Sequence, residues 1–226
     1  MQLDFNNIVN IKINDIQMNL PSPAFRDSHF IQLYTKYRDI KHGDIIIDAG
    51  CYPGDFMIYA VQKGCNKCYS FEPSIKNKET IKSIINLNTG IDNSKFEIFN
   101  SALYKDNGNV LFYHNPINPD TSGVDANPKI PGACNLVNTI TLDSFMIIEG
   151  LKEVNFLKMD VEGSELDIIE GAKESLKNKV IKYLAIAAYH VINGEQSHIK
   201  LRKIFDEYGY KTNIHYEDHL TLYAEC

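Results

Sequence analysis

Apolar runs and helical stripes alternate along most of this chain, from residue 41 to its end. Short apolar runs that end in turns predict strands buried on both faces of a parallel sheet. Such strands are expected at 44–49, 67–71, 96–99, 154–159 and 180–188. Helices with one apolar stripe are expected at 56–62, 74–88, 164–176 and 201–208. This order predicts an α/β fold with a doubly wound, mostly parallel, seven-stranded Rossmann-like sheet.

Two further segments frame this alternating region. Residues 8–20 alternate apolar and polar positions around Asn14-Asp15, which predicts a β-hairpin, and 25–37 has apolar residues at helical spacing. Near the other end, 211–216 and 220–224 predict an antiparallel C-terminal hairpin. We therefore expect a small N-terminal extension of hairpin and helix at 1–40, and one main domain at 41–226.

The segment 114–138 has no apolar periodicity and contains repeated proline and glycine. A loop of this length inside a compact domain is usually functional or disordered. We therefore expect 114–138 to form a loop on the substrate side of the fold.

The composition of the chain limits the kinds of partner that it is expected to bind. The chain has 226 residues and a formal net charge of -6, with no stretch dense in lysine and arginine. This argues against nucleic acid or an anionic membrane as the main partner. The odd count of 5 cysteines, with no recognisable signal peptide, favours reduced thiols and a cytoplasmic protein. The sequence makes no prediction of the oligomeric state.

Polar residues follow two of the predicted strands. Asp160 and Glu162 come directly after strand 154–159, and His190 follows strand 180–188. Open α/β sheets bind ligands outside the carboxyl ends of their strands, and carboxylates there are costly without a ligand, metal or proton-transfer role. The alternative for Glu162 is a simple match to the dipole of the following helix.

The segment Asp48-Ala49-Gly50-Cys51-Tyr52-Pro53-Gly54 closes the first sheet strand and opens a helix. Gly50 allows a tight turn and Gly54 close packing, but the middle glycine of a dinucleotide fingerprint is missing and Pro53 lacks an amide donor. The turn is therefore poorly suited to a pyrophosphate, whereas Asp48 could attract an ammonium group.

Glu72 ends the next strand, where an acidic side chain can bind both hydroxyls of a ribose. Together with the glycine turn, it predicts a nucleoside ligand with a charged amino-acid tail. The alternative is that Asp48 caps a helix and Glu72 is a surface charge.

These motifs resemble those of class I S-adenosylmethionine-dependent methyltransferases, and specifically those of the FkbM family. The resemblance spans about 44–190 and rests on Asp48–Gly54, Phe71-Glu72-Pro73, Asn100-Ser101-Ala102-Leu103, Thr141-Leu142-Asp143 and Lys158–Glu165. The family's usual Asp-Val-Gly-Ala-Asn-x-Gly is altered here, because Tyr52-Pro53 replaces its small and polar pair. The domain at 41–226 would then be the methyltransferase domain.

The resemblance implies a role for each matched residue. Near the methionine end of S-adenosylmethionine it places Asp48 and Gly50. The ribose would contact Glu72, and the adenine side Ser101 or Ala102. Tyr52, Gly54 and Pro73 are further expected cofactor-binding residues. Asp160 would lie close to the sulfonium or the acceptor. The family is associated with O-methylation of sugars and natural products, which implies a small-molecule acceptor that bears a hydroxyl.

An alcohol acceptor needs a group that takes its proton, and Asp160, Glu162 and His190 are the catalytic candidates. We expect His190 or Asp160 to be the base, with Glu162 orienting the base or the acceptor. The carboxylates of Asp143, Asp160 and Glu162 are suitable oxygen ligands for a divalent cation. Their spacing in the sequence does not show that they converge on one site. Two other classes stay open: a nicotinamide-dependent Rossmann oxidoreductase and a non-catalytic nucleoside-binding module.

Overall fold

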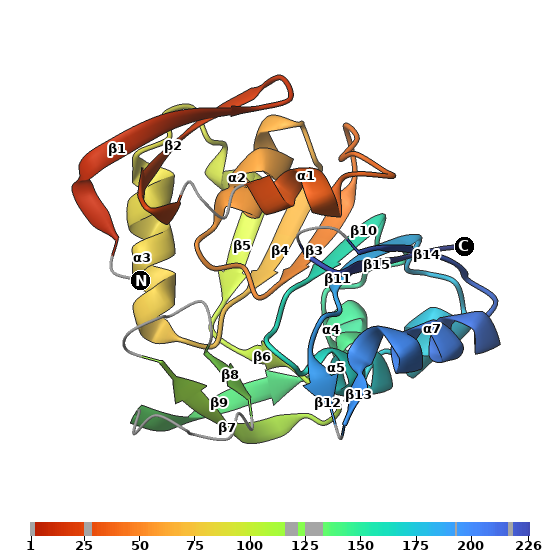
Figure 1. Ribbon diagram of the computed structural model, residues 1–226. Coiled ribbons are helices and arrows are strands. Elements are labelled where there is room, and N and C mark those ends of the chain that lie inside the picture. Colours follow the sequence, from red (N-terminus) through yellow and green to blue (C-terminus); the bar gives the residue numbers. More distant parts are fainter. Residues whose placement is uncertain (1–2, 25–28, 116–121, 125–132, 193, 217–218) are drawn as a thin grey trace.

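The computed structural model describes residues 3–24, 29–115, 122–124, 133–192, 194–216 and 219–226. Within these residues a seven-stranded sheet has the order β14-β15-β11-β10-β3-β4-β5 (Figure 1). Its strands are β3 (Ile45–Ala49), β4 (Lys67–Phe71), β5 (Phe96–Phe99), β10 (Phe156–Met159), β11 (Tyr183–Ala187), β14 (Lys211–His215) and β15 (Thr221–Glu225). The strands from β5 to β11 pair in parallel, whereas β15 is antiparallel to β11 and β14. This confirms the predicted α/β fold with a mostly parallel sheet.

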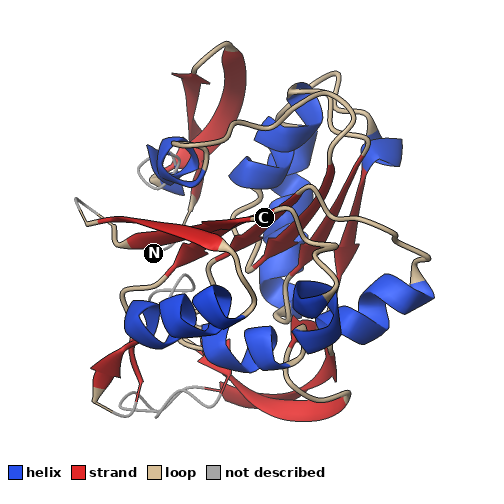
Figure 2. Cartoon of the chain, turned by 90° about the vertical axis from the view of Figure 1, so that its right-hand side faces the viewer, coloured by secondary structure: helices blue, strands red, loops and turns tan. Residues whose placement is uncertain are grey.

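Helices cover both faces of the sheet because its strands are apolar on both sides (Figure 2). In β11, Tyr183 and Ala185 pack toward one face, and Leu184 and Ile186 pack toward the other. The first face carries α2 (Asp55–Gln62) and α3 (Ile75–Asn86). The second carries α4 (Leu142–Ile148), α5 (Glu165–Glu170), α6 (Lys173–Lys177) and α7 (Ser197–Glu207).

The predicted N-terminal hairpin is present as β1 (Asp4–Ile13) and β2 (Ile16–Ser22). Met18 and Leu20 of β2 are buried in the same hydrophobic core as α2 and α3, and Figure 1 shows the hairpin beside α3. The hairpin therefore shares the core of the sheet. A boundary at residue 40 between an extension and a main domain stays a prediction.

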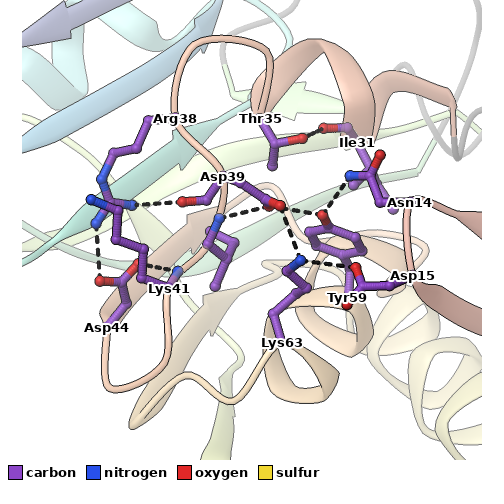
Figure 3. Close-up of polar contacts among 11 residues, drawn as sticks. Asn14, Asp15, Ile31, Thr35, Arg38, Asp39, Lys41, Asp44, Tyr59 and Lys63 are labelled. Carbon is purple, nitrogen blue, oxygen red and sulfur yellow. Dashed lines mark hydrogen bonds and ion pairs between the residues drawn. The ribbon is translucent and has the colours of Figure 1, made fainter.

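A polar cluster fastens the turn of this hairpin to α2 (Figure 3). Asn14 donates from Nδ2 to the hydroxyl of Tyr59 at 2.9 Å, and Tyr59 donates to Asp39 at 2.7 Å. Lys63 lies 2.9 Å from Asp15 and 3.0 Å from Asp39. The helix predicted at 25–37 is short: α1 covers Phe30–Tyr34, and 25–28 lie outside the described residues.

A second, mixed sheet lies beneath the carboxyl ends of the main strands (Figure 1). In spatial order its described strands are β6 (Ala102–Leu103), β9 (Ala133–Ile140), β7 (Gly108–His114) and β8 (Gly123–Val124). The prediction of a continuous loop at 114–138 is therefore wrong at 123–124 and 133–138, because both pieces pair with β7. The prediction is also wrong at His114, which ends β7, whereas 116–121 and 125–132 lie outside the described residues.

The single helix predicted at 164–176 is also wrong, because α5 ends before Gly171 and α6 starts after Ala172. A Cβ at Gly171 would overlap the backbone oxygen of Tyr104. The helix is therefore interrupted at the point where the chain passes close to another segment. Shorter described elements are the 3-10 turn Asn93–Lys95 and the strands β12 (Val191–Ile192) and β13 (Glu195–Gln196). Within the described part of the chain, no helix combines the length and apolar character needed to cross a membrane.

Candidate active site

A cavity of about 340 Å³ opens at the carboxyl ends of β3, β4 and β10. Parallel strands bring these three ends to one edge of the sheet, and β6, β7 and β8 close the cavity from below. Its wall is largely apolar and aromatic, with Asp160 and Glu162 as its acidic side chains among the described residues. The cavity therefore combines apolar surface with a few placed charges, as small-molecule sites do.

Gly50 forms the tight turn after β3, with φ +75°. Its amide and that of Cys51 both donate to the carbonyl of Phe71, each at 3.1 Å. A Cβ at residue 50 would overlap the backbone oxygen of Asp160. Only glycine lets the turn pass this close to the end of β10, so Gly50 shapes the cavity it lines.

The rest of this turn divides between the cavity and the helix packing. Tyr52 and Pro53 line the cavity. Gly54 does not: it is the N-cap residue of α2, with φ +99°, and a Cβ there would lie 2.8 Å from Cγ2 of Ile81 in α3. Gly54 therefore serves the packing of α2 against α3, and its expected role in binding a cofactor stays a prediction.

Asp48 is fully buried and stands behind the cavity wall. Its Oδ1 lies 3.1 Å from Nζ of Lys158, which donates to the carbonyl of Gly50 at 2.6 Å. Burial raises the pKa of the Asp48 carboxyl, and the ion pair with Lys158 offsets part of that rise. Asp48 thus balances the buried lysine that holds the glycine turn, so its predicted direct contact with a cofactor does not match its position.

Glu72 lies at the end of β4, between the cavity residues Phe71 and Pro73; it is 4% exposed and does not itself line the cavity. Its Oε1 accepts from the amide of Ser74 at 2.8 Å and from Nδ2 of Asn77 at 3.4 Å. Burial raises the pKa of Glu72 to about 7 and outweighs these hydrogen bonds. The carboxyl is therefore fixed in orientation and costly to ionise.

The strand ends beside Glu72 are held by a side-chain amide. Asn100 donates from Nδ2 to the carbonyls of Glu72 at 3.0 Å and Pro73 at 2.8 Å. Of the two residues predicted on the adenine side, Ala102 lines the cavity and Ser101 does not. The floor at this point is therefore apolar.

Asp160 lines the cavity, and its two carboxylate oxygens differ in their partners. Its Oδ2 accepts from the hydroxyl of Tyr34 at 2.8 Å, while Oδ1 is buried and has no hydrogen-bond partner among the described residues. Tyr34 belongs to α1, so the N-terminal segment holds this carboxylate in place. A buried polar atom without a partner is costly, and this one belongs to a residue that lines the cavity.

Glu162 follows in a left-handed backbone conformation, with φ 55°. It accepts from the hydroxyl of Tyr189 at 3.0 Å and lies 3.4 Å from Nε2 of His190. The other ring nitrogen of His190 lies 3.0 Å from Glu165. Glu162 lines the cavity, whereas His190 stands behind it between the two carboxylates.

This placement contradicts the predicted role of His190 as the base. Burial lowers the pKa of a histidine, but the hydrogen bonds and charges of Glu162 and Glu165 outweigh it and raise the pKa of His190 to about 10. The raised pKa favours the imidazolium, which has no lone pair to accept a proton. His190 instead holds Glu162 at the cavity rim.

The predicted oxygen ligands for a cation do not converge. Asp143 lies at α4, where its carboxylate accepts from the amides of Ser175 at 2.8 Å and Glu174 at 3.0 Å, away from the cavity. In the part of the chain that the structure describes, no cluster of histidine, cysteine and carboxylate residues could hold a metal ion.

Sequence reasoning missed the aromatic wall of the cavity. Phe30, Tyr189 and His219 all line it. The ring centroid of His219 lies 4.6 Å from that of Phe30 and 4.7 Å from that of Tyr189. The helical stripe of 25–37 contained Phe30, but nothing in the sequence indicated that three segments so far apart would meet.

Methyltransferases are among the known proteins with a similar sequence or fold. The family described as "Methyltransferase FkbM domain" matches residues 48–212. The structure of methyltransferase FkbM from Methylobacillus flagellatus KT aligns with 86% of this chain and 47% of its own, at 19% identity and a TM-score of 0.64. This chain thus spans about half the length of that structure. A comparison with curated proteins gave no match.

Two other structures share the fold at lower identity. Aeropyrum pernix fibrillarin with natively bound S-adenosyl-L-methionine aligns with 96% of this chain and 82% of its own, at 13% identity and a TM-score of 0.52. Sp1610 of Streptococcus pneumoniae, whose name proposes a tRNA (m1A22) methyltransferase, is also in complex with S-adenosyl-L-methionine. It aligns with 88% of this chain and 72% of its own, at 12% identity and a TM-score of 0.52.

Proposed function

Since this chain belongs to the FkbM methyltransferase family, we propose that it uses S-adenosylmethionine to methylate a hydroxyl on a sugar or a natural-product-like small molecule. The sequence left open that the glycine turn belonged to a nicotinamide-dependent oxidoreductase. The family match and the fold favour a methyltransferase instead. One observation carries the proposal: a single cavity joins the glycine turn and the end of β4 to a buried, unpartnered carboxylate oxygen of Asp160.

The cofactor side of this cavity fits S-adenosylmethionine. Gly50 leaves room where any side chain would overlap the end of β10, and Ala102 offers apolar surface for an adenine. Ser74 and Asn77 fix one oxygen of Glu72, so its second oxygen can accept from a ribose hydroxyl. When bound, the cofactor supplies a methyl group on a positively charged sulfur.

The acceptor side is acidic and aromatic. Oδ1 of Asp160 can accept a hydrogen bond from an acceptor hydroxyl, and Tyr34 keeps the carboxylate from turning away. Glu162 is held in the same way by Tyr189. Positioning of this kind supplies much of the rate in an in-line methyl transfer.

We do not propose a nucleic acid as the acceptor, although one structural neighbour is named for tRNA. The net charge of -6 and the two carboxylates at the cavity disfavour a polyanion. A small neutral molecule with a hydroxyl meets no such repulsion.

The cofactor half is tested by calorimetric titration with S-adenosylhomocysteine. Wild-type protein is expected to bind, and Gly50→Ala to lose roughly 100-fold or more in affinity, because the new Cβ drives the turn into the cavity. Gly43→Ala is the matched control: Gly43 also has a positive φ, +86°, but a Cβ there meets no atom within 4 Å. Absence of binding by folded wild-type protein would favour a non-catalytic module.

The acceptor half is tested with S-adenosylmethionine that carries a tritiated methyl group. The probes are a panel of methyl glycosides, with catechol as an aromatic hydroxyl and bulk tRNA as a nucleic acid. Transfer to a glycoside or to catechol supports the proposal. Transfer to tRNA alone would overturn the acceptor class while leaving the methyltransferase in place.

A further inference from the structure

His219 lies in the turn that leads into β15, and its ring forms part of the cavity wall. Besides its contacts with Phe30 and Tyr189, it meets the ring of Tyr34 edge-on, with 6.0 Å between centroids. Tyr34 holds Asp160 and Tyr189 holds Glu162. The imidazole is therefore packed between the two tyrosines that position the acidic side chains of the cavity.

Both His219 and Phe30 lie outside residues 48–212, the stretch that the family match covers. The cofactor-side residues Gly50 and Glu72 lie inside it. Two of the three side chains of the aromatic wall thus come from parts of the chain that the family match does not cover, while the third, Tyr189, lies inside it.

The neighbours of His219 select its tautomer. Thr221 is fully buried and donates its hydroxyl proton to the carbonyl of His219 at 3.0 Å. The same hydroxyl oxygen lies 3.4 Å from Nδ1 of the ring, and while its proton goes to that carbonyl it accepts from Nδ1. The proton of a neutral ring is then on Nδ1, and Nε2 carries the lone pair. No described residue donates a hydrogen bond to Nε2.

The charge of the ring follows from its surroundings. Asp160 and Glu162 line the cavity beside it, the charges of His190 and Lys158 act on it from behind the cavity wall, and the tyrosine rings pack beside it. Burial lowers the pKa of His219 below its ordinary 6.5, and the two carboxylates only partly oppose this. Near neutral pH His219 is uncharged, whereas His190 is protonated.

We propose that His219 is the general base of this site, a role that rests on the proposed methylation of a hydroxyl. The acceptor oxygen bonds to the methyl carbon as the carbon–sulfur bond breaks and leaves its electron pair on sulfur. The hydroxyl proton moves to Nε2 of His219, which becomes an imidazolium, and is later released to solvent. Asp160 accepts the hydrogen bond that orients the acceptor and stabilises the imidazolium.

The first test needs no acceptor. NMR of protein with ¹⁵N-labelled histidine, saturated with S-adenosylhomocysteine, reports the tautomer and titration of each ring, and His219→Asn identifies the signal. The expected result is an Nδ1-protonated neutral ring that titrates below 6.5. An Nε2-protonated ring, or one still charged at pH 8, would overturn the proposal.

The second test uses the tritiated methyl donor and the glycoside and catechol panel. His219→Asn is expected to lower kcat roughly 10²–10⁴-fold, to keep its affinity for S-adenosylhomocysteine, and to lose the acid limb of the pH profile. His215→Asn is the matched control, since His215 pairs with Thr221 in the same hairpin but does not line the cavity.

The outcomes separate the two claims. If wild-type protein binds S-adenosylhomocysteine but methylates no probe, the proposed acceptor class fails. The tautomer of His219 measured by NMR then decides whether its Nε2 can act as a base. If wild-type protein methylates a probe and His219→Asn retains its kcat and its acid limb, the proposed function stands and His219 is not the base.

Discussion

Glu72 is buried to 4% exposure at the end of β4, and burial raises its pKa to about 7 from an ordinary 4.5. Because the folded-state pKa is raised, ionisation favours the unfolded chain, and the free energy of unfolding falls as pH rises between these two values. The site thus holds a carboxylate whose charge costs stability, which is characteristic of residues kept for a ligand.

We predict that Glu72→Gln raises the free energy of unfolding at pH 8 by about 1–3 kcal/mol, because it removes the buried charge and keeps an oxygen for Ser74 and Asn77. The same change is expected to weaken S-adenosylhomocysteine binding about tenfold or more, since a ribose loses a charged acceptor. Urea unfolding at pH 5 and pH 8 measures the first effect. Equal stability of both proteins at both pH values would contradict it, and Glu207→Gln, an exposed change, is the control.

At the scale of elements, α3 connects the core to the cofactor side of the cavity. Ser74 caps this helix by accepting from the amide of Asn77 at 3.2 Å, and both residues also hold Glu72. Thr141 caps α4 in the same manner, by accepting from the amide of Ser144 at 3.1 Å, on the opposite face of the sheet. The two caps are similar in chemistry and differ in whether the helix start touches the site.

Ser74→Ala and Thr141→Ala should therefore separate stability from binding. Each is expected to lower the free energy of unfolding by about 1 kcal/mol, as lost N-caps do. Only Ser74→Ala is expected to weaken S-adenosylhomocysteine binding, because the loosened helix start releases Glu72. Paired denaturation and calorimetry measure both effects. Similar binding by the two variants would show that the α3 cap does not position the carboxyl.

The elements that the sequence predicted well are those whose apolar pattern is set by the sheet itself. The strands β3, β4, β10 and β11 lie within their predicted ranges or match them, because buried parallel strands leave continuous apolar runs. By contrast, β9 was missed: Leu136 is 67% exposed, and the strand is fixed by pairing with β7 rather than by core burial. Its pattern therefore carried no periodic signal.

For the whole molecule, the site also has one part that the sequence predicted and one part that it did not. The grouping of Gly50, Glu72 and Asp160 was visible in the sequence, since they stand at strand ends that a parallel sheet must bring together. The acceptor side was not, because Phe30 and His219 meet only through tertiary packing of the two ends of the chain. The same packing decided that His190 lies between two carboxylates and outside the cavity.

That packing also bears on whether residues 1–40 form a separate unit. Leu20 of β2 is fully buried in the core that α2 and α3 share, and the polar cluster of Asn14, Tyr59 and Lys63 joins the hairpin turn to α2 (Figure 3). Because Tyr34 and Phe30 come directly after this hairpin, its anchoring also bears on the acceptor side of the cavity.

Leu20→Ala is predicted to cost about 2–5 kcal/mol and to shift one cooperative unfolding transition of the whole chain, since the cavity it leaves opens in the shared core. Calorimetry together with circular dichroism in the tyrosine region measures this, with Ile8→Ala, a 38% exposed position on β1, as the control. A second transition that alone moves with Leu20→Ala would instead show that the hairpin unfolds as its own domain. A single shifted transition means that the hairpin, the sheet and the aromatic wall unfold as one cooperative unit. Substitutions in the N-terminal hairpin, far from the cavity, will then alter the acceptor side.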